Sequence, residues 1–315
     1  MKRLLIALMC LAFAPAFAAD YPNHPIRLIV PTAPGGGSDL ISRLLAEEAG
    51  KTLGQPIIVE NRPGANGNVG MNEVAKGEKD GYTLGNCAIG VCSVNQLFYD
   101  MPFDFKRELK PVFWATSLTN MLVVKNDGKI KTLDDFIALA KSRELNYSSS
   151  GIGSAHHMSA ELLGKELGIK FQHVTYRGAA PALTAVIAGE VDFMIENVPS
   201  VISYLEGGQL TGLGVTSNKR SPMAAKIATF PEQGYKGVIV EPWFGFVVAA
   251  GTPPDVVTKL NQAFNQAIQT QKIKDRFRDM DLTIEGGSPE RFGEHIDSEV
   301  AKWKSIVAAA GIKKQ

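Results

Sequence analysis

The chain has 315 residues, of which 33 are Lys or Arg, 32 are Asp or Glu and 45% are hydrophobic. A chain of this length and composition can bury a sizeable core, and we expect two domains rather than one. Charges of both signs are interspersed and leave a formal net charge of +1. This balance excludes an acidic disordered chain and a basic nucleic-acid-binding protein.

The first nineteen residues have the pattern of a secretory signal peptide. Lys2 and Arg3 precede an apolar run at 4–13, and small residues occupy both positions of the cleavage motif. We expect residues 1–19 to be removed on export, with cleavage near Ala18–Ala19. No later stretch reaches about 18 uninterrupted apolar residues, so no membrane-spanning helix is expected in the mature chain.

The two cysteines of the mature chain, Cys87 and Cys92, would enter a compartment that permits disulfide bonds. Their spacing allows a bond that closes a small loop, and the alternative is two buried thiols beside the end of a strand. Neither histidines nor further cysteines accompany the pair, so the spacing does not indicate a zinc site. We expect neither a metal nor a cofactor.

Strand-like and helix-like segments alternate along most of the chain. A β-branched run at 26–30 is followed by a glycine-rich turn, and the periodicity of 38–53 predicts an amphipathic helix before a strand at 56–60. This alternation indicates an α/β fold with mostly parallel sheets. Further strands are predicted at 82–85, 121–125, 145–148, 171–176 and 191–195, and further helices at 133–141, 154–167 and 179–188.

The last third of the chain has a different order. An apolar strand is predicted at 243–249, and two long helices are predicted at 253–270 and 291–310. Two α/β lobes joined by two crossing strands fit this layout, with the chain leaving the first lobe near 121–125. The predicted lobes are residues 20–122 with 244–315, and residues 123–243.

Two loops are the strongest candidates for a ligand site, because open sheets bind ligands beyond the carboxyl ends of their strands. The loop at 31–39 contains three glycines and leads into a helix N-terminus with unpaired N–H groups. The loop at 148–157 repeats this pattern with serines and glycines. Together they would hold a carboxylate through amides and hydroxyls; the alternative for the first loop is an ordinary tight turn. Tyr176, at the end of another strand, would form a wall.

Several motifs extend over nearly the whole mature chain, among them PGGGSD at 34–39 and ENRPGANGN at 60–68. These two motifs and the remaining ones resemble the motifs of the Bug family, the extracytoplasmic solute receptors of tripartite tricarboxylate transporters. The remaining motifs are at 21–31, 80–84, 176–182, 189–192, 215–222 and 243–253.

The resemblance implies a two-lobed periplasmic binding protein type 2 fold with two crossing hinge strands. It implies a periplasmic receptor, not an enzyme, that captures a small organic carboxylate and delivers it to integral membrane transporter subunits. One ligand per chain suggests a monomer. The ligand-binding residues that the resemblance suggests are Thr32, Ala33, Gly35, Gly36, Ser38 and Asp39 in the first lobe, and Ser150, Gly153, Ser154, His156 and Asp192 in the second lobe. Tyr176, and Cys87 in the loop at 86–96 that normally borders the ligand in this family, are further candidates.

Departures from the family pattern leave the ligand open. Thr32 stands where the family often has an aromatic residue, and Glu196 replaces the usual Asp before Asn197. The loop at 86–96 also lacks the usual sequence. Asp192 has an alternative role at the turn between a helix and a strand.

Two rival classes share some of these features. A secreted hydrolase could use Ser154 together with His156 or His157. Adjacent histidines on a helix point about 100° apart, so at most one of them could serve the serine. The residues at 151–155 also lack the G-x-S-x-G pattern of a nucleophile elbow. A binding protein of another importer, or a sensor, would have the same architecture, and only the family motifs argue against it.

Overall fold

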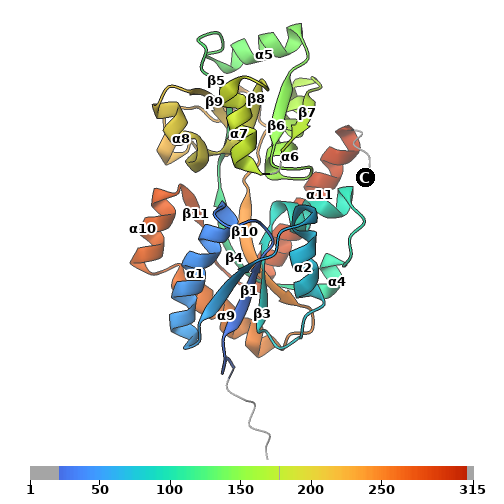
Figure 1. Cartoon of the computed structure of the whole chain (residues 1–315), viewed down its shortest axis with the longest axis vertical. Helices are drawn as coiled ribbons and strands as arrows, with labels where there is room; N and C mark the ends of the chain where they lie inside the picture. The colour runs from blue at the N-terminus through green and yellow to red at the C-terminus, as the bar shows by residue number, and fades with distance from the viewer. Residues whose placement is uncertain (1–20, 177, 311–315) are drawn as a thin grey trace, which may run out of the picture.

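Two β-sheets, each covered by helices, form the two halves of the molecule (Figure 1). The computed structural model describes residues 21–176 and 178–310. The expected signal peptide at 1–19 lies outside this described part of the chain. Lobe 1 is built on a six-stranded sheet and lobe 2 on a five-stranded sheet.

The sheet of lobe 1 combines strands from both ends of the described chain. Its strand β1 pairs in parallel with β2 and β3, whereas β10 pairs antiparallel with β3 and β4. The β-branched and apolar residues of β1 suit a strand that is buried on both faces. In sheet order the strands are β11 (Leu282–Ile284), β4 (Leu109–Leu118), β10 (Trp243–Ala249), β3 (Thr83–Ala88), β1 (Ile26–Val30) and β2 (Ile57–Asn61).

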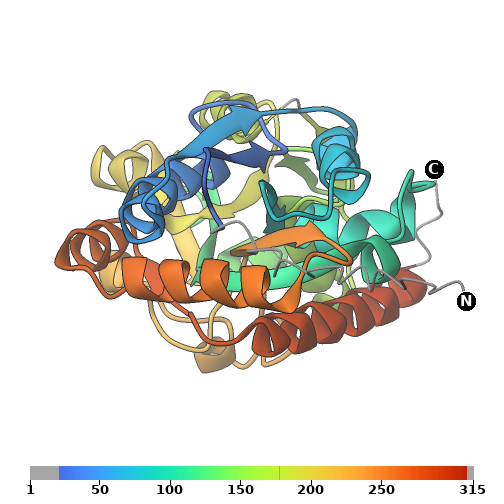
Figure 2. The same ribbon diagram turned by 90° about the horizontal axis from the view of Figure 1, so that it is seen from below.

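Helices cover both faces of this sheet. Leu28 of β1 belongs to a buried cluster with the helices α1, α9 and α10, and Ile29 belongs to a second cluster with α2 and α11. Figure 2 shows α1 and α10 on one side and α2 and α11 on the other. The helices are α1 (Gly37–Leu53), α2 (Asn68–Ala75), α3 (Asn95–Phe98), α4 (Phe105–Glu108), α9 (Pro254–Ala267), α10 (Gln271–Asp279) and α11 (Pro289–Ala310).

Lobe 2 has the same layered construction. Helices α5 and α6 pack on one face of its sheet around Phe136 and Leu163, and α7 and α8 pack on the other around Val186 and Val201. The strands in sheet order are β7 (Gln172–Thr175), β6 (Asn146–Ser149), β8 (Phe193–Asn197), β5 (Asn120–Lys125) and β9 (Leu210–Val215), and the helices are α5 (Leu133–Ser142), α6 (Ala155–Leu167), α7 (Ala179–Ala188) and α8 (Val198–Glu206).

The chain crosses between the lobes twice. The first crossing is at Thr119, between β4 in one sheet and β5 in the other, and the second lies within 216–242, between β9 and β10. The boundary expected at 122/123 falls inside β5. The lobes also share buried side chains on one side, where Met158 and Leu162 of α6 pack in the same cluster as Trp303 of α11.

The expectation of mostly parallel sheets is wrong. Among the described strands, four pairings are parallel and five are antiparallel. The physical reason is that the chain crosses between the lobes twice. Strands β5 and β10 each enter a new sheet from the hinge side. They are therefore antiparallel to the neighbouring strands that lead toward the hinge. The α/β class and the two-lobed architecture are as predicted.

Candidate functional site

The first candidate loop lies between β1 and α1 and is held in shape by Asp39. The Asp39 carboxylate accepts hydrogen bonds from the backbone N–H of Gly35 at 3.0 Å, from Nδ2 of Asn61 at 3.0 Å and from Nε of Arg43 at 3.1 Å. Burial raises the pKa of Asp39, but the bonds from Arg43, Gly35 and Asn61 outweigh it, so the net shift is downward. A second bond from Asn61, to the carbonyl oxygen of Thr32 at 3.1 Å, fixes the start of the loop.

This arrangement leaves backbone donors free at the start of α1. Thr32, Ala33, Gly35 and Gly36 are exposed, and Gly35 has a φ of 85° that favours glycine. In the described part of the chain the N–H groups of residues 36–38 have no hydrogen-bond partner, as expected of a helix start without a side-chain cap. Ser38 is buried in that first turn. The loop therefore offers amides to an anion.

Asp39 itself does not support the expected direct contact with a ligand. Both of its oxygens are engaged, because Oδ1 also lies 2.9 Å from the guanidinium of Arg43. Only 5% of the residue is exposed. The contacts of Asp39 therefore order the loop.

The second candidate loop, between β6 and α6, has the same relation to its sheet. Gly151 and Gly153 have φ values of 147° and 78°, which lets the chain turn sharply before the helix. Oγ of Ser154 caps α6 by accepting the N–H of His157 at 3.3 Å. The N–H of Gly153 is donated to Nδ1 of His157 at 3.0 Å and is therefore not free for a ligand.

Three side chains form a continuous chain of contacts beside this loop. Oγ of Ser150 lies 2.8 Å from Nδ1 of His156, and Nε2 of His156 lies 3.1 Å from Oε1 of Glu196 at the end of β8. Ser150 is partly exposed, whereas His156 and Glu196 are buried. From the sequence, Glu196 is only a departure from the family pattern. The pairing of Ser154 with His156 that a hydrolase would need is not formed.

Two further histidines lie behind the loop. The rings of His157 and His173 are stacked with centroids 4.4 Å apart, and Nε2 of His173 lies 2.6 Å from Oγ of Ser149. Burial, helped by the neighbouring His173, lowers the pKa of His157 to about 3. Burial also lowers the pKa of His173 to about 4. Both rings are therefore neutral at physiological pH.

The two lobes touch through a residue that the sequence analysis did not name as a site residue. Nδ2 of Asn66 in lobe 1 donates to the carbonyl oxygen of Ile152 in the second loop at 3.0 Å and to Oδ1 of Asn95 at 2.6 Å. Oη of Tyr99 donates to the same Ile152 oxygen at 3.4 Å. Ala65 and Asn66 have φ values of 44° and 52°. Such left-handed backbone in non-glycine residues is uncommon and often occurs at functional sites.

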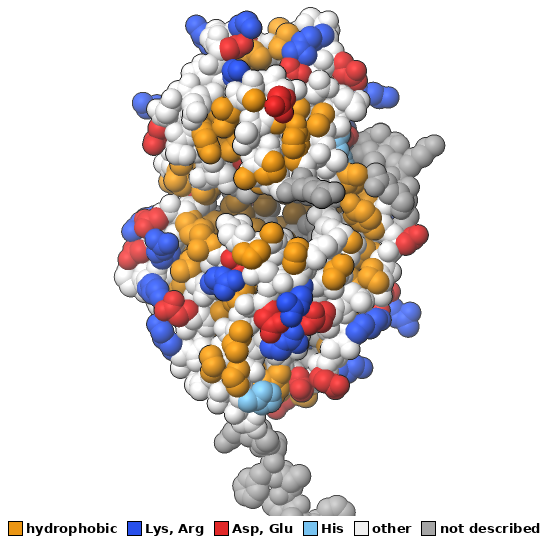
Figure 3. Space-filling view, viewed as in Figure 1, with side chains coloured by type: hydrophobic (Ala, Val, Ile, Leu, Met, Phe, Trp, Pro, Cys, Tyr) orange, Lys and Arg blue, Asp and Glu red, His pale blue; other side chains and the backbone are white. Residues whose placement is uncertain are grey.

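The space-filling view shows the molecule hollowed between the lobes (Figure 3). Both loops follow strands whose carboxyl ends meet at this hollow, β1 in lobe 1 and β6 in lobe 2. The two helix N-termini and the partly exposed Ser150 therefore belong to one interlobe cleft.

Two of the suggested site residues, Cys87 and Asp192, have other surroundings. Cys87 is fully buried and forms a disulfide with Cys92, so it has no thiol to offer a ligand. Asp192 lies at the opposite end of its sheet, where it pairs with Arg143 and accepts the N–H of Asn146 at 2.7 Å. It is a structural residue of the turn before β8. The ring of Tyr176 packs against the cluster between the sheet and the helices α7 and α8.

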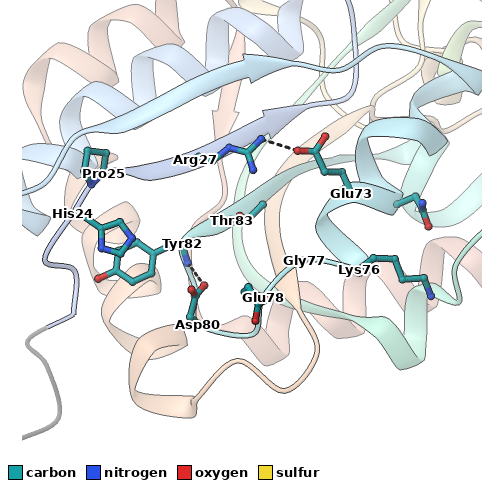
Figure 4. Close-up of a pocket in the computed structure, with 11 residues that line it drawn as sticks. His24, Pro25, Arg27, Glu73, Lys76, Gly77, Glu78, Asp80, Tyr82 and Thr83 are labelled. Atoms are coloured by element: carbon teal, nitrogen blue, oxygen red, sulfur yellow. Dashed lines mark hydrogen bonds and ion pairs between the residues drawn. The ribbon is translucent and has the colours of Figure 1, made fainter.

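The depression shown in Figure 4 is not part of this cleft. Its volume is about 590 Å³. It lies where β1 and β3 begin, at the end of the strands opposite the loops. Among its lining side chains, Arg27 lies 2.6 Å from Glu73, and Arg27 also lies 2.8 Å from Glu60 beside the depression. His24 stacks on Tyr82.

Comparison with known proteins identifies the family. The family model described as "Tripartite tricarboxylate transporter family receptor" matches residues 41–312. The chain belongs to this family of receptors. The family predicted from the sequence motifs is thus confirmed. The chain is 32% identical to the protein BugT of Bordetella pertussis, over 95% of this chain and 93% of that protein.

Solved structures of relatives confirm the fold. An R. palustris protein solved with adipate is 32% identical, with a TM-score of 0.87 over 94% of this chain and 100% of that chain. MatC from Rhodopseudomonas palustris, solved with bound malate, is 29% identical, with a TM-score of 0.83 over 91% of this chain and 100% of that chain.

The described chain covers residues 21–176 and 178–310. Within these ranges no helix has the length and apolar character that crossing a membrane requires. The same ranges contain no group of three or more His, Cys, Asp or Glu side chains arranged to hold a metal ion.

Proposed function

We propose that this receptor captures a small organic carboxylate between its lobes in the periplasm and delivers it to the membrane subunits of a tripartite tricarboxylate transporter. The observation that carries the proposal is the set of free N–H groups at the start of α1, in the described part of the chain. Free amides at a helix N-terminus favour an anion.

The ligands of the relatives support the same chemistry. Adipate and malate, which accompany the two R. palustris structures, are both small dicarboxylates. In this chain we assign one carboxylate to the amides at 36–38 and the exposed backbone at Thr32 and Ala33. We assign the opposite end of the ligand to Ser150 and the capping hydroxyl of Ser154. No catalytic role is proposed for either serine.

Closure of the lobes would convert binding into a signal for the membrane partner. The crossings at Thr119 and within 216–242 are the connections about which the lobes can rotate. The bond from Asn66 to Ile152 joins the lobes beside the loops, and it would stabilise a closed state. A ligand that touches both loops favours this state, because it binds the closed form more tightly than the open form. One ligand per chain makes a monomer sufficient.

A thermal-shift panel tests the ligand class. The mature protein is heated with di- and tricarboxylates, acidic amino acids, aromatic acids, sugars and phosphate esters. A ligand at 100 times its Kd adds about 2.7 kcal/mol to the free energy of unfolding, so a cognate carboxylate raises the Tm in a concentration-dependent way. A response to a sugar or a phosphate ester alone, with none to any carboxylate, would refute the proposal.

Gly37→Pro tests the amide donors directly. Proline is tolerated at the first position of a helix, and the extended backbone of Gly36 (φ −82°, ψ 173°) is compatible with a following proline. The change removes one free N–H, and we expect carboxylate affinity to fall about tenfold or more. Gly37→Ala keeps the N–H and is the matched control. Equal affinity of the two variants would remove this amide from the site.

A further inference from the structure

The contact chain Ser150–His156–Glu196 links the cleft to a buried carboxylate. The three residues come from the loop after β6, the first turn of α6 and the end of β8. Glu196 is fully buried, and its Oε1 accepts the N–H of Asn197 at 2.7 Å in addition to its contact with His156. Its Oε2 has no hydrogen-bond partner in the described part of the chain.

The charge on Glu196 is compensated only through this contact. Across the described residues, His156 is the one side chain that forms an ion pair with Glu196. A buried carboxylate without a cation is costly, and a protonated imidazole at 3.1 Å removes much of that cost.

The protonation state of His156 decides what Ser150 offers the cleft. When His156 is neutral and donates from Nε2 to Glu196, its Nδ1 accepts the hydroxyl proton of Ser150. The serine then presents only lone pairs, and the chain of contacts carries one negative charge. When His156 is protonated, Nδ1 donates to Oγ of Ser150, and the hydroxyl proton is free to point into the cleft. The contact chain is then neutral.

We propose that Ser150, His156 and Glu196 form a proton-linked subsite, in which a ligand carboxylate bound at Ser150 is taken up together with one proton on His156. This inference rests on the proposed function. It assigns an anionic carboxylate to the lobe 2 end of the ligand. An ammonium group at that place would need the neutral histidine, because only then does Ser150 act purely as an acceptor.

The other titratable groups around the loop make their contacts elsewhere. On α6, His157 contacts His173 and Gly153, and Glu161 accepts the hydroxyl of Tyr147. From lobe 1, the hydroxyl of Tyr99 is directed to the carbonyl oxygen of Ile152. On β8, Glu196 itself is the charged group that faces His156. A linked proton is therefore expected on His156.

Calorimetry in two buffers of different ionisation enthalpy measures the proton directly. The ligand is the strongest binder of the carboxylate panel, with adipate and malate titrated first. We expect the binding enthalpy to depend on the buffer and to report net proton uptake. The apparent Kd should rise with pH, by at most about tenfold per pH unit for one linked proton.

Variants assign the proton to the subsite. Glu196→Gln removes the buried charge and His156→Gln removes the imidazole, so each should abolish the buffer dependence of the enthalpy and flatten the pH profile of Kd. His24→Gln is the matched control, because His24 lies in the depression of Figure 4, on the opposite edge of lobe 1. It should leave proton uptake unchanged. Circular dichroism melts confirm that each variant folds.

Each outcome separates this inference from the proposed function. If no carboxylate binds, the proposed function fails, and the proton-linked subsite fails with it. If a carboxylate binds with no buffer-dependent enthalpy, or with proton uptake that persists in Glu196→Gln, only the subsite is overturned. Affinity that increases as the pH rises would also overturn it, because a donor group of the ligand would then occupy Ser150.

Discussion

The two ligand loops have the same backbone arrangement but are held by different side chains. In both, a strand ends at the cleft, glycines turn the chain, and a helix begins. The lobe 1 loop is held by Asp39, whose carboxylate is paired with Arg43 and keeps its charge down to low pH. The lobe 2 loop is held by neutral histidines, His157 and His173, and contains no carboxylate of its own. Similar anion sites can therefore respond differently to acid.

The largest expected effect is a loss of stability in acid that comes from lobe 2. Burial lowers the pKa of His157 from 6.5 to about 3 and of His173 from 6.5 to about 4. Below pH 6.5 the unfolded chain binds more protons than the folded one, so this contribution is complete above pH 6.5 and is lost as the pH falls toward 4 and 3. We expect the pair to lose at least about 2 kcal/mol of stability near pH 4.

Urea unfolding at several pH values measures this loss. The variant with both His157→Gln and His173→Gln should depend less on pH than the wild type between pH 6.5 and 4. Carboxylates elsewhere titrate equally in both proteins, so the difference isolates the histidines. Parallel pH profiles would show that the rings do not titrate as their burial indicates.

Asp39→Ala should produce the next largest effect, confined to lobe 1. The change leaves the N–H of Gly35, the amide of Asn61 and the guanidinium of Arg43 without their shared acceptor. We expect a loss of about 2 kcal/mol in stability and at least tenfold in carboxylate affinity. Asp39→Asn keeps one acceptor oxygen, so its stability and carboxylate affinity should lie between those of the wild type and Asp39→Ala. Wild-type affinity in Asp39→Ala would show that the loop does not depend on this residue.

Changes at Asn66 should separate the interlobe contact from backbone strain. Asn66→Gly and Asn66→Ala both remove the bond to Ile152, so both should weaken ligand binding about fivefold. Alanine also tolerates the φ of 52° poorly, so only Asn66→Ala should lose a further 1 kcal/mol or so of stability. Calorimetry and chemical unfolding provide the two readouts. Unchanged affinity in both variants would mean that the contact does not stabilise the closed state.

The smallest effect is expected from the cap of α6. Ser154→Ala removes an N-cap and should cost about 1 kcal/mol of stability, with a matching loss of affinity if the hydroxyl also meets the ligand. Thr132→Ala removes the cap of α5, which lies in the same lobe but belongs to neither loop. It should lower stability similarly and leave binding unchanged. Equal binding losses in the two variants would exclude a direct role for Ser154.

Local patterns predicted the positions of the loops because turns and caps depend on neighbouring residues. Glycines at 35–37 and the serine at 154 have the local roles that their residue types favour. Strand β4 was not predicted, because a proline such as Pro111 typically indicates the end of a strand. In the structure Pro111 pairs with Val247 beside a register shift, which accommodates the proline.

The sequence by itself determined the family, the α/β class, the two lobes and the two loops between strand and helix. These features depend on motifs, hydrophobic periodicity and backbone preferences that act over a few residues. Only the tertiary structure showed that Ser150, His156 and Glu196 are in contact, that Asn66 bridges the lobes, and that Asp192 lies away from the cleft. Glu196 is 40 residues from His156 in the chain, and only the packing of β8 against the start of α6 brings the two together.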